Sequence, residues 1–317
     1  MEFSFTTLGT ASALPTANRY PSAHVLSVHE RLFLIDCGEG TQMQMRRAGI
    51  PFSKIDSIFI SHLHGDHIFG LFGLLSTIAL NGRTATLNIF APEQFSKILS
   101  FFLEQFGEGI KYEIIHNVVK CKEPLLVHTS KQVDVYAFPL IHRVETYGYL
   151  FKEKEPNRNV LKHLIEPYKL TLYEIARLKE GQDIVRTVVE DDLEYEQLLK
   201  AEEFTYMPYK ARSFAYCSDT LPFKRIFNWI NGVDLIYHEA TYAAELAADA
   251  KKRFHSTTED AATCAKESNA KELIIGHFSS RYKDLQPLLL EAQAIFPNTK
   301  LAKEGTKFEI PLVKMVK

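Results

Sequence analysis

A cluster of imidazole and carboxylate side chains directly after a short apolar run constrains this chain most. The run Ile58-Phe59-Ile60 is followed by Ser61-His62-Leu63-His64-Gly65-Asp66-His67. β-Branched and aromatic residues favour a buried strand, so the pattern predicts a strand that delivers ligands into the loop beyond it. A solvated polar loop is the alternative, but such a density of ligand-type side chains is rarely incidental. We take a metal site as the working hypothesis.

The residue types in this loop indicate the kind of ion. Imidazole and carboxylate together suit zinc or a similar borderline divalent ion, and manganese can occupy related sites. His62 and His64 stand two positions apart, so on extended backbone they can point the same way toward one ion. Asp66 and His67 follow the flexible Gly65 and turn toward a second position.

Three later apolar runs each end in one more ligand-type residue. His142 follows the predicted strand Val133–Phe138, Asp219 follows a run that begins at Ser213, and His277 follows Glu272-Leu273-Ile274-Ile275-Gly276. In open α/β sheets, sites lie beyond the carboxyl ends of the strands, so these strand ends can converge on the opening loop.

The combined set has more ligands than one tetrahedral zinc ion with an open position needs. It divides between two ions: a first with His62, His64 and His142, a second with Asp66, His67 and His277, and a bridging carboxylate from Asp219. Two ions ~3.5 to 4 Å apart can lower the pKa of a water between them to near 7 and stabilise charge developing on a phosphoryl group. The set therefore predicts metal-assisted hydrolysis.

The composition is that of an ordinary globular chain. Its 317 residues, 46% hydrophobic and 24% charged, can bury a full core. No run approaches the ~18 to 20 apolar residues of a membrane span, and no signal segment is apparent, so we expect a cytoplasmic protein without a membrane association. Four separated cysteines predict neither disulfides nor a thiolate zinc site. The net charge of -2 means that RNA binding must depend on local basic patches.

Strands and helices alternate along the chain, which predicts a layered α/β domain over residues 1–317. Helices are expected over Gln42–Ala48, over Ile68–Leu80 and from Pro92 to about Phe106, with a strand near Tyr112–Ile115.

Between Lys152 and Ala211 the chain becomes rich in Lys, Arg and Glu, and it separates His142 from Asp219 by a long excursion. We interpret this segment as an inserted, partly helical arm. Basic side chains there could contact phosphates: Lys152, Lys154, Arg158, Lys162, Lys169, Arg177, Lys179 and Arg186. The alternative is a solvated helical insertion of mixed charge.

Two further stretches suggest acid–base chemistry. His238-Glu239-Ala240-Thr241 follows a predicted strand, and His255-Ser256-Thr257 precedes a predicted helix. A carboxylate paired with an imidazole beside a dinuclear site could supply a proton to a leaving oxygen. Alternatively, His255 is a structural residue at the start of the helix.

Taken together, these motifs resemble those of metallo-β-lactamase-fold hydrolases, and more closely those of the short form of ribonuclease Z, the tRNA 3′-processing endoribonucleases. The similarity extends almost from end to end: Leu8-Gly9-Thr10, Asp36-Cys37-Gly38-Glu39-Gly40-Thr41-Gln42, the loop Ile60–Leu71, His142, Ser218-Asp219-Thr220, His238-Glu239-Ala240-Thr241, His255-Ser256-Thr257 and Gly276-His277-Phe278-Ser279-Ser280-Arg281-Tyr282. The loop indicates only the superfamily, whereas the last three motifs are more specific to ribonuclease Z.

The resemblance implies a four-layer αββα sandwich with two Zn²⁺ per chain, usually a homodimer. It implies cleavage of precursor tRNA after the discriminator nucleotide, leaving a 3′-hydroxyl, with no DNA substrate. Two alternatives are a phosphodiesterase of the same fold acting on small or cyclic phosphodiesters, and a catalytically silent RNA-binding or scaffold protein.

The resemblance also implies roles for single residues. Asp66 would be a general base as well as a ligand, and Glu239 with His255 would be the proton-donating pair. Asp36 would support the ligand loop from behind. Candidates for holding a phosphate near the cut are Ser279, Ser280 and Arg281. One departure concerns the arm, where Thr171-Leu172-Tyr173-Glu174 stands in place of the Gly-Pro-rich tip of the family.

Overall fold

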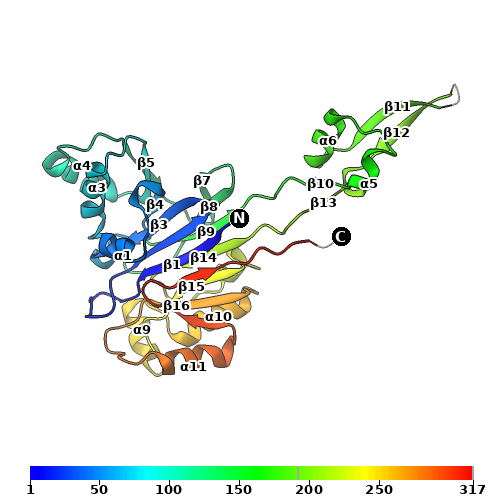
Figure 1. The fold of residues 1–317 in the computed structure, drawn as a ribbon. Coiled ribbons are helices and arrows are strands. Elements are labelled where there is room, and N and C mark those ends of the chain that lie inside the picture. The colour runs from blue at the N-terminus through cyan, green and yellow to red at the C-terminus, as the bar shows by residue number, and fades with distance from the viewer. Residues whose placement is uncertain (191–192, 316–317) are drawn as a thin grey trace. The chain divides into compact units, whose positions relative to one another are not determined.

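The structure, a computed structural model, describes residues 1–190 and 193–315 (Figure 1). The chain divides into two compact units. The first contains Met1–Lys152 and Arg212–Ile310, and the second contains Glu153–Ala211 together with the C-terminal residues from Pro311. Within the described residues, no helix combines the length and apolar character that crossing a membrane requires.

Two seven-stranded sheets form the centre of the first unit. The first sheet has the order β18 (Lys307–Glu309), β1 (Phe3–Gly9), β2 (Ala23–Val28), β3 (Arg31–Cys37), β4 (Ile55–Phe59), β5 (Leu87–Pro92) and β6 (Ile114–Val119). The second sheet has the order β17 (Thr299–Leu301), β16 (Glu272–Gly276), β15 (Leu235–Glu239), β14 (Ser213–Cys217), β9 (Tyr147–Glu153), β8 (Val133–Pro139) and β7 (Leu125–Thr129).

Each sheet is part parallel and part antiparallel. Strands β3 to β6 and strands β14 to β17 pair in parallel, whereas β1, β2 and β18 and the pairs β7–β8 and β9–β14 are antiparallel. Every residue of β15 is buried. Such continuous burial is typical of parallel strands that are covered on both faces.

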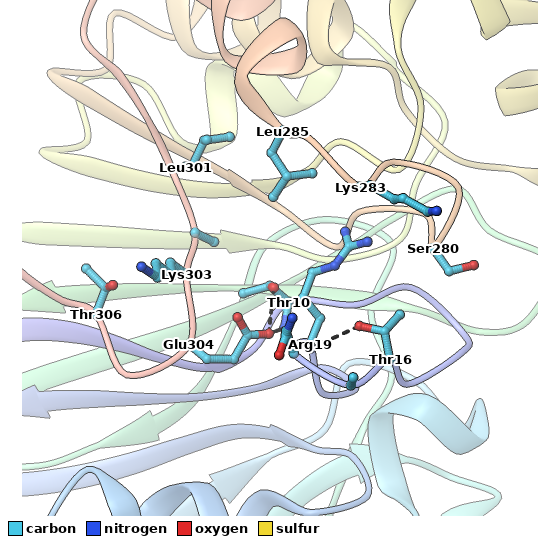
Figure 2. A pocket seen from close by; sticks show the side chains of 13 residues that line it. Thr10, Thr16, Arg19, Ser280, Lys283, Leu285, Leu301, Lys303, Glu304 and Thr306 are labelled. Carbon is cyan, nitrogen blue, oxygen red and sulfur yellow. Dashed lines mark hydrogen bonds between the residues drawn. The ribbon is translucent and has the colours of Figure 1, made fainter.

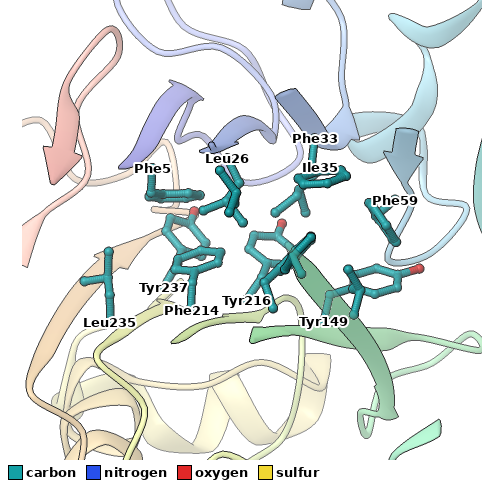
Figure 3. Close-up of a cluster of buried hydrophobic side chains, with 14 of the residues drawn as sticks. Phe5, Leu26, Phe33, Ile35, Phe59, Tyr149, Phe214, Tyr216, Leu235 and Tyr237 are labelled. Atoms are coloured by element: carbon teal, nitrogen blue, oxygen red, sulfur yellow. The ribbon is translucent and has the colours of Figure 1, made fainter. Parts of the chain in front are cut away.

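A core rich in aromatic residues joins the two sheets (Figure 3). Phe5 and Phe33 of the first sheet face Phe214 and Phe151 of the second, with ring centroids 4.6 Å and 5.7 Å apart. Tyr149 reaches across the sheets and donates a hydrogen bond to the carbonyl of Ile60 at 2.7 Å. This contact fixes the end of β4, where the ligand loop begins.

Helices cover the outer faces of both sheets. The helices of the first unit are α1 (Thr41–Arg47), α2 (Gly65–Ile68), α3 (Leu71–Leu80), α4 (Phe95–Phe106), α8 (Arg225–Trp229), α9 (Ala247–Arg253), α10 (Thr258–Glu267) and α11 (Gln286–Ile295), with short 3-10 turns at Phe52–Lys54 and Ala244–Leu246. One apolar cluster joins α1, α3 and α4 to the first sheet, and another joins α8, α10 and α11 to the second. The predicted αββα sandwich is confirmed.

The prediction of a single helix over Ile68–Leu80 is wrong in one respect. The segment is interrupted at Phe69 and Gly70, which separate α2 from α3. Gly70 N–H donates to the carbonyl of Cys37 at 2.9 Å. A Cβ on Gly70 would lie 2.0 Å from the carbonyl oxygen of Gly38. The close approach to the end of β3 therefore interrupts the helix and holds α2 beside the ligand loop.

Two other boundaries also differ from expectation. Strand β5 continues through Pro92, which pairs with Val119 of β6, and α4 begins only at Phe95. The parallel ladder to β6 therefore keeps Pro92 extended instead of starting the helix. The strand expected near Tyr112–Ile115 lies further along the chain, as β6, where it pairs with β5 from Ile114 to Val119.

The second unit has a small core of its own. Its elements are β10 (Asn159–Val160), α5 (Lys162–Ile165), α6 (Leu172–Lys179), β11 (Ile184–Glu190), β12 (Leu193–Leu199), α7 (Ala201–Phe204) and β13 (Thr205–Tyr206). The buried side chains that hold them together are Leu170, Leu178, Leu199, Ala201 and Phe204. The segment expected to be partly helical therefore also contains a long hairpin, β11–β12, which the composition did not suggest.

The hairpin has a simple basis in the sequence. β-Branched residues, which favour strands, make up most of β11, and the exposed Val185, Thr187 and Val189 alternate with half-buried residues along it. Residues 191 and 192 of the predicted arm lie outside the described part. Helix α6 begins with a capping box in which Thr171 and Glu174 bind each other's backbone N–H groups, so the stretch that replaces the Gly-Pro-rich tip is a helix start.

Candidate metal centre

The predicted ligands come from loops just beyond the carboxyl ends of strands in both sheets. His62 and His64 follow β4, Asp66 and His67 lie on α2, His142 follows β8, Asp219 follows β14, and His277 follows β16. The fold thus brings together all seven residues that the sequence singled out, as two groups that meet at Asp219.

The first group consists of His62, His64, His142 and Asp219, whose ligand atoms all lie within 4.8 Å of one another. Nδ1 of His64 lies 2.9 Å from Nε2 of His62 and 3.3 Å from Nε2 of His142. Three ring nitrogens and a carboxylate oxygen thus surround one point. In neutral imidazoles, each of these nitrogens can offer a lone pair to a shared cation there.

The second group consists of Asp66, His67 and His277, again with ligand atoms within 4.8 Å. Nε2 of His67 lies 3.3 Å from Nε2 of His277, and Oδ2 of Asp66 lies 3.5 Å from each of these nitrogens. Asp66 is oriented by the backbone N–H of Ala13, which donates to Oδ2 at 2.8 Å. His277 adopts a left-handed φ of 59°, a conformation that His tolerates better than most residues.

Asp219 stands between the two groups. Its Oδ1 lies 3.6 Å from Nε2 of His67 and 3.3 Å from Nε2 of His277. Its Oδ2 lies 3.7 Å from Nε2 of His62 and 3.8 Å from Nε2 of His142. Among the described residues, the buried Oδ1 has no hydrogen-bond partner. A buried carboxylate oxygen without a donor is costly, whereas a bound cation satisfies it. This cluster of imidazole and carboxylate groups therefore fits a metal site.

The nitrogen that faces away from the cluster is bound in several of the histidines. The contacts are His62 Nδ1 to Ser61 Oγ at 3.0 Å, His67 Nδ1 to Asp36 Oδ2 at 2.8 Å, His142 Nδ1 to the Phe254 carbonyl at 2.8 Å, and His277 Nδ1 to Thr241 Oγ1 at 3.0 Å. Such contacts fix ring orientation and tautomer. They orient the other nitrogen of each ring toward the cluster.

Asp36 is the centre of this supporting layer. It is fully buried, and its carboxylate accepts hydrogen bonds from the N–H of Ser61 at 2.7 Å, from Ser61 Oγ at 2.9 Å and from Tyr216 Oη at 2.6 Å. These contacts agree with the expectation that Asp36 supports the ligand loop from behind. The parts played by Ser61, Tyr216 and Thr241 were not predicted, because nothing local in the sequence shows which residues cross from one sheet to the other.

Carboxylates surround the buried imidazoles. Burial by itself lowers the pKa of His67, but the carboxylates of Asp66 and Asp36 raise it to about 10. Burial likewise lowers the pKa of His62, which keeps that imidazole in its neutral, metal-binding form. The site thus concentrates negative charge that a cation would neutralise.

Glu239 and His255 form a pair beside the cluster. His255 Nδ1 lies 3.0 Å from Oε1 of Glu239 and 3.8 Å from Oδ2 of Asp219. Glu239 is fully buried, and both of its oxygens are occupied, Oε1 also by the N–H of Ser256 at 2.9 Å and Oε2 by Oγ1 of Thr241 at 2.7 Å.

The two partners shift each other's protonation. Burial alone would raise the pKa of Glu239, but the adjacent His255 lowers it to about 2. Burial alone would lower the pKa of His255, but Glu239 and Asp219 raise it to about 9. Each member of the pair therefore favours the charged form of the other.

The predicted phosphate-holding residues follow His277 in the chain. Ser279 and Ser280 are half-buried, and Arg281 is exposed with its guanidinium 5.1 Å from the ring centre of Tyr242. They lie on the loop beyond β16, in the same unit as the cluster.

The basic residues expected to contact RNA fall into both units: Lys152 on β9 of the first, and Lys154, Arg158, Arg177 and Lys179 in the second. Arg158 Nε donates to Oγ1 of Thr205 at 2.5 Å, and the exposed Arg177 lies 5.9 Å from the ring centre of Tyr173. Arg186 is bound by Glu174 at 3.1 Å, so its charge is used within the unit.

Comparison with known proteins places this geometry in context. A family model described as anti-Pycsar protein Apyc1 matches residues 3–155. The short form of human tRNase Z superposes with a TM-score of 0.68 at 25% identity, covering 97% of this chain and 99% of that one. The metallo-β-lactamase fold protein YhfI from Bacillus subtilis gives the same TM-score at 19% identity, covering 98% of this chain and 100% of that one. At this low identity, the similarity to YhfI concerns the fold alone.

Curated relatives named ribonuclease Z match almost the whole chain. The relative from Bacteroides thetaiotaomicron is 42% identical over 304 residues, covering 96% of this chain and 94% of its own length. The relative from Porphyromonas gingivalis strain W83 is 43% identical over 308 residues, with 97% and 99% coverage. With this identity over nearly its full length, the chain belongs to the ribonuclease Z family.

Proposed function

We propose that this protein is a metal-dependent endoribonuclease that removes the 3′ trailer from precursor tRNA and leaves a 3′-hydroxyl on the tRNA. The observation that carries the proposal is the pair of ligand groups that meet at Asp219, in a chain similar to ribonuclease Z over nearly its whole length.

The proposal includes two zinc ions per chain, with manganese as the alternative. His62, His64 and His142 would hold one, Asp66, His67 and His277 the other, and Asp219 would contribute an oxygen to each. Bound there, two divalent ions would make a water molecule more acidic and neutralise charge on the phosphodiester.

Asp66 is proposed to accept the proton of the attacking water. Its carboxylate lies at the edge of the cluster and is only partly covered, with 13% of the side chain exposed. The hydrogen bond from Ala13 N–H fixes one oxygen, so the carboxylate keeps one orientation during the reaction.

His255 is proposed to give a proton to the departing 3′-oxygen, and Glu239 to orient it. The ring of His255 is 14% exposed, whereas Glu239 is completely enclosed by donors. An ionised, fully bound carboxylate has no proton to give, so Glu239 acts through His255. Ser279, Ser280 and Arg281 would hold the phosphate beside it.

The arm, the homodimer and the cytoplasmic location also belong to the proposal. The exposed basic residues of the second unit would contact the tRNA. The homodimer and the cytoplasm rest on the family resemblance, and light scattering and cell fractionation test them.

The decisive experiment incubates the purified, zinc-loaded protein with a precursor tRNA that carries a 3′ trailer, and maps the product ends. We expect one cut that leaves a 3′-hydroxyl, loss of cutting on chelation, and about two metal ions per chain. An uncut precursor, while a control ribonuclease Z cuts it, would overturn the proposal. Hydrolysis restricted to bis(p-nitrophenyl) phosphate or cyclic nucleotides would indicate the small phosphodiesterase, and a metal-free, inactive RNA binder would indicate the scaffold.

A further inference from the structure

A second feature of the first unit is a hollow of about 790 Å³ whose lining carries Arg19, Lys283 and Lys303 (Figure 2). It is formed by the loop after β1, by the loop after the predicted phosphate-holding residues, and by the turn between β17 and β18. The chain as a whole has a net charge of -2, so this gathering of cations is local.

Arg19 is poised to bind an acceptor. Its Nη2 donates to the carbonyl of Tyr282 at 2.7 Å, which holds the guanidinium in place. Its Nη1 is buried and, among the described residues, has no hydrogen-bond partner. A buried cationic donor without an acceptor is costly. Arg19 also lines the hollow, so the charge of its guanidinium attracts an anionic group bound there.

Lys283 and Lys303 add two positive charges to that of Arg19, whereas the lining carries the single carboxylate of Glu304. Both side chains are exposed, and within the described part of the chain neither forms an ion pair. The acidic Glu304 is already engaged, since its Oε1 accepts from Oγ1 of Thr10 at 2.8 Å and from the N–H of Tyr20 at 3.2 Å. The same bonds tie the loop after β1 to the turn between β17 and β18, so the hollow is preformed.

The rest of the lining suits the remaining part of a nucleotide. Leu285 and Leu301 supply an apolar wall against which a base or ribose can pack, and Ser280 supplies a hydroxyl. Cations beside an apolar surface, without a set of base-reading amides, are typical of sites that bind single-stranded nucleic acid without sequence preference.

Two of the loops that line the hollow also reach the Asp66 side of the candidate metal centre. Its wall residue Ser280 lies three positions beyond His277, and the loop that carries Arg19 also carries Ala13, whose N–H binds Asp66. His255 lies between the two ligand groups, with its ring centre 5.2 Å from that of His142 and 5.7 Å from that of His277, and it lines a separate hollow of about 350 Å³. If His255 serves the departing 3′-oxygen, the tRNA end occupies the hollow beside His255, which leaves the hollow beside Ser280 for the trailer.

We propose that the hollow lined by Arg19, Lys283 and Lys303 binds the first nucleotides of the 3′ trailer through their phosphates. This inference rests on the proposed function, because it assigns the trailer side of that cut.

A binding experiment tests the hollow independently of cleavage. The ligand is a fluorescent, 5′-phosphorylated hexauridylate, and the Lys283→Ala/Lys303→Ala double variant is compared with the charge-matched Lys97→Ala/Lys111→Ala control. We expect the first double variant to bind on the order of tenfold or more weakly than the control. The slope of the logarithm of its binding constant against the logarithm of the salt concentration should also be shallower, by about 0.7 for each phosphate that the variant no longer neutralises.

Equal affinity of the two double variants would overturn the proposal. Competition by inorganic phosphate alone that is as effective as competition by the oligonucleotide would also overturn it, because the site would then bind free phosphate and not a strand.

A cleavage experiment locates the strand. Precursor tRNAs with trailers of one and of six nucleotides are compared as substrates. For each substrate, the KM of the Lys283→Ala/Lys303→Ala variant is divided by that of the wild type, and we expect this ratio to be at least about tenfold larger for the long trailer. Equal losses on both substrates would assign the lysines to tRNA binding in general and overturn the inference. If the wild type cuts neither substrate, the proposed function fails, while the oligonucleotide experiment still decides whether the hollow binds single strands.

Discussion

At the scale of single residues, Asp36 links the two sheets behind the metal centre. It belongs to β3 of the first sheet, yet it binds Tyr216 of β14 in the second and His67 of the ligand loop. Its left-handed φ of 55° turns the carboxylate toward these partners. The ligand geometry therefore depends on a side chain that would not itself touch the ions.

Replacing Asp36 with Asn should weaken metal binding with little change in backbone, because Asn also tolerates left-handed φ. The amide cannot accept from all the present donors, so we expect zinc affinity to fall roughly 10- to 100-fold in a chelator competition. Asp56→Asn is the matched control, since Asp56 pairs with Arg31 at the surface. Unchanged zinc affinity in Asp36→Asn would contradict the supporting role.

Replacing His255 with Ala should slow precursor tRNA cleavage by roughly 100-fold or more, the usual scale of general acid–base catalysis. Bound metal, measured by atomic emission, should stay the same because all seven proposed ligands remain. His29→Asn, in the turn between β2 and β3 where φ is 47°, is the control and should keep the full rate. Loss of metal from His255→Ala would instead make His255 a ligand or a structural residue.

At the scale of elements, the break between α2 and α3 places the ligand loop. Gly70 donates its N–H to the carbonyl of Cys37 instead of continuing the helical hydrogen bonds, and it lies too close to the Gly38 carbonyl for a side chain. These contacts join the break to the end of β3.

A pair of glycine substitutions tests this explanation. Gly70→Ala should destabilise the fold by roughly 1–3 kcal/mol, because its Cβ would lie 2.0 Å from a carbonyl oxygen. Gly73→Ala, in the exposed middle of α3, should be neutral or stabilising by up to about 1 kcal/mol, since its Cβ meets only Gln42 at 3.6 Å. Urea unfolding measures both. Equal stabilities would mean that the backbone moves apart at little cost.

At the scale of the whole molecule, the second unit is an insertion between two neighbouring strands. Strands β9 and β14 are antiparallel, and Lys152 pairs with Ser213, so a short turn could replace the segment without lengthening either strand. The insertion also has its own buried cluster, separate from the cores of the first unit. Its removal is therefore compatible with an intact metal centre.

Deleting the residues between Lys152 and Tyr209 should abolish cleavage of precursor tRNA and spare hydrolysis of bis(p-nitrophenyl) phosphate. The small phosphodiester needs the metal centre but no distant grip on tRNA. Metal content and thermal unfolding provide the check that the first unit stays folded. A folded variant that loses both activities to the same extent would argue against an RNA-gripping role for the arm.

The sequence by itself determined the fold class and which histidine and aspartate side chains cluster in the candidate metal centre. Both follow from local patterns: apolar runs define strands, and a ligand-type residue at the end of each run marks the edge where strands meet. The αββα layering and the family were expected from the resemblance of the motifs to ribonuclease Z, and the comparisons bear out both expectations.

Only the tertiary structure decided how those residues are supported. The break at Gly70, the bonds from Tyr216 to Asp36 and from Thr241 to His277, and the gathering of cations around Arg19 all join segments far apart in the chain. Local patterns record burial and backbone preference. They do not record which surfaces pack together, and that packing sets the orientation of each ligand.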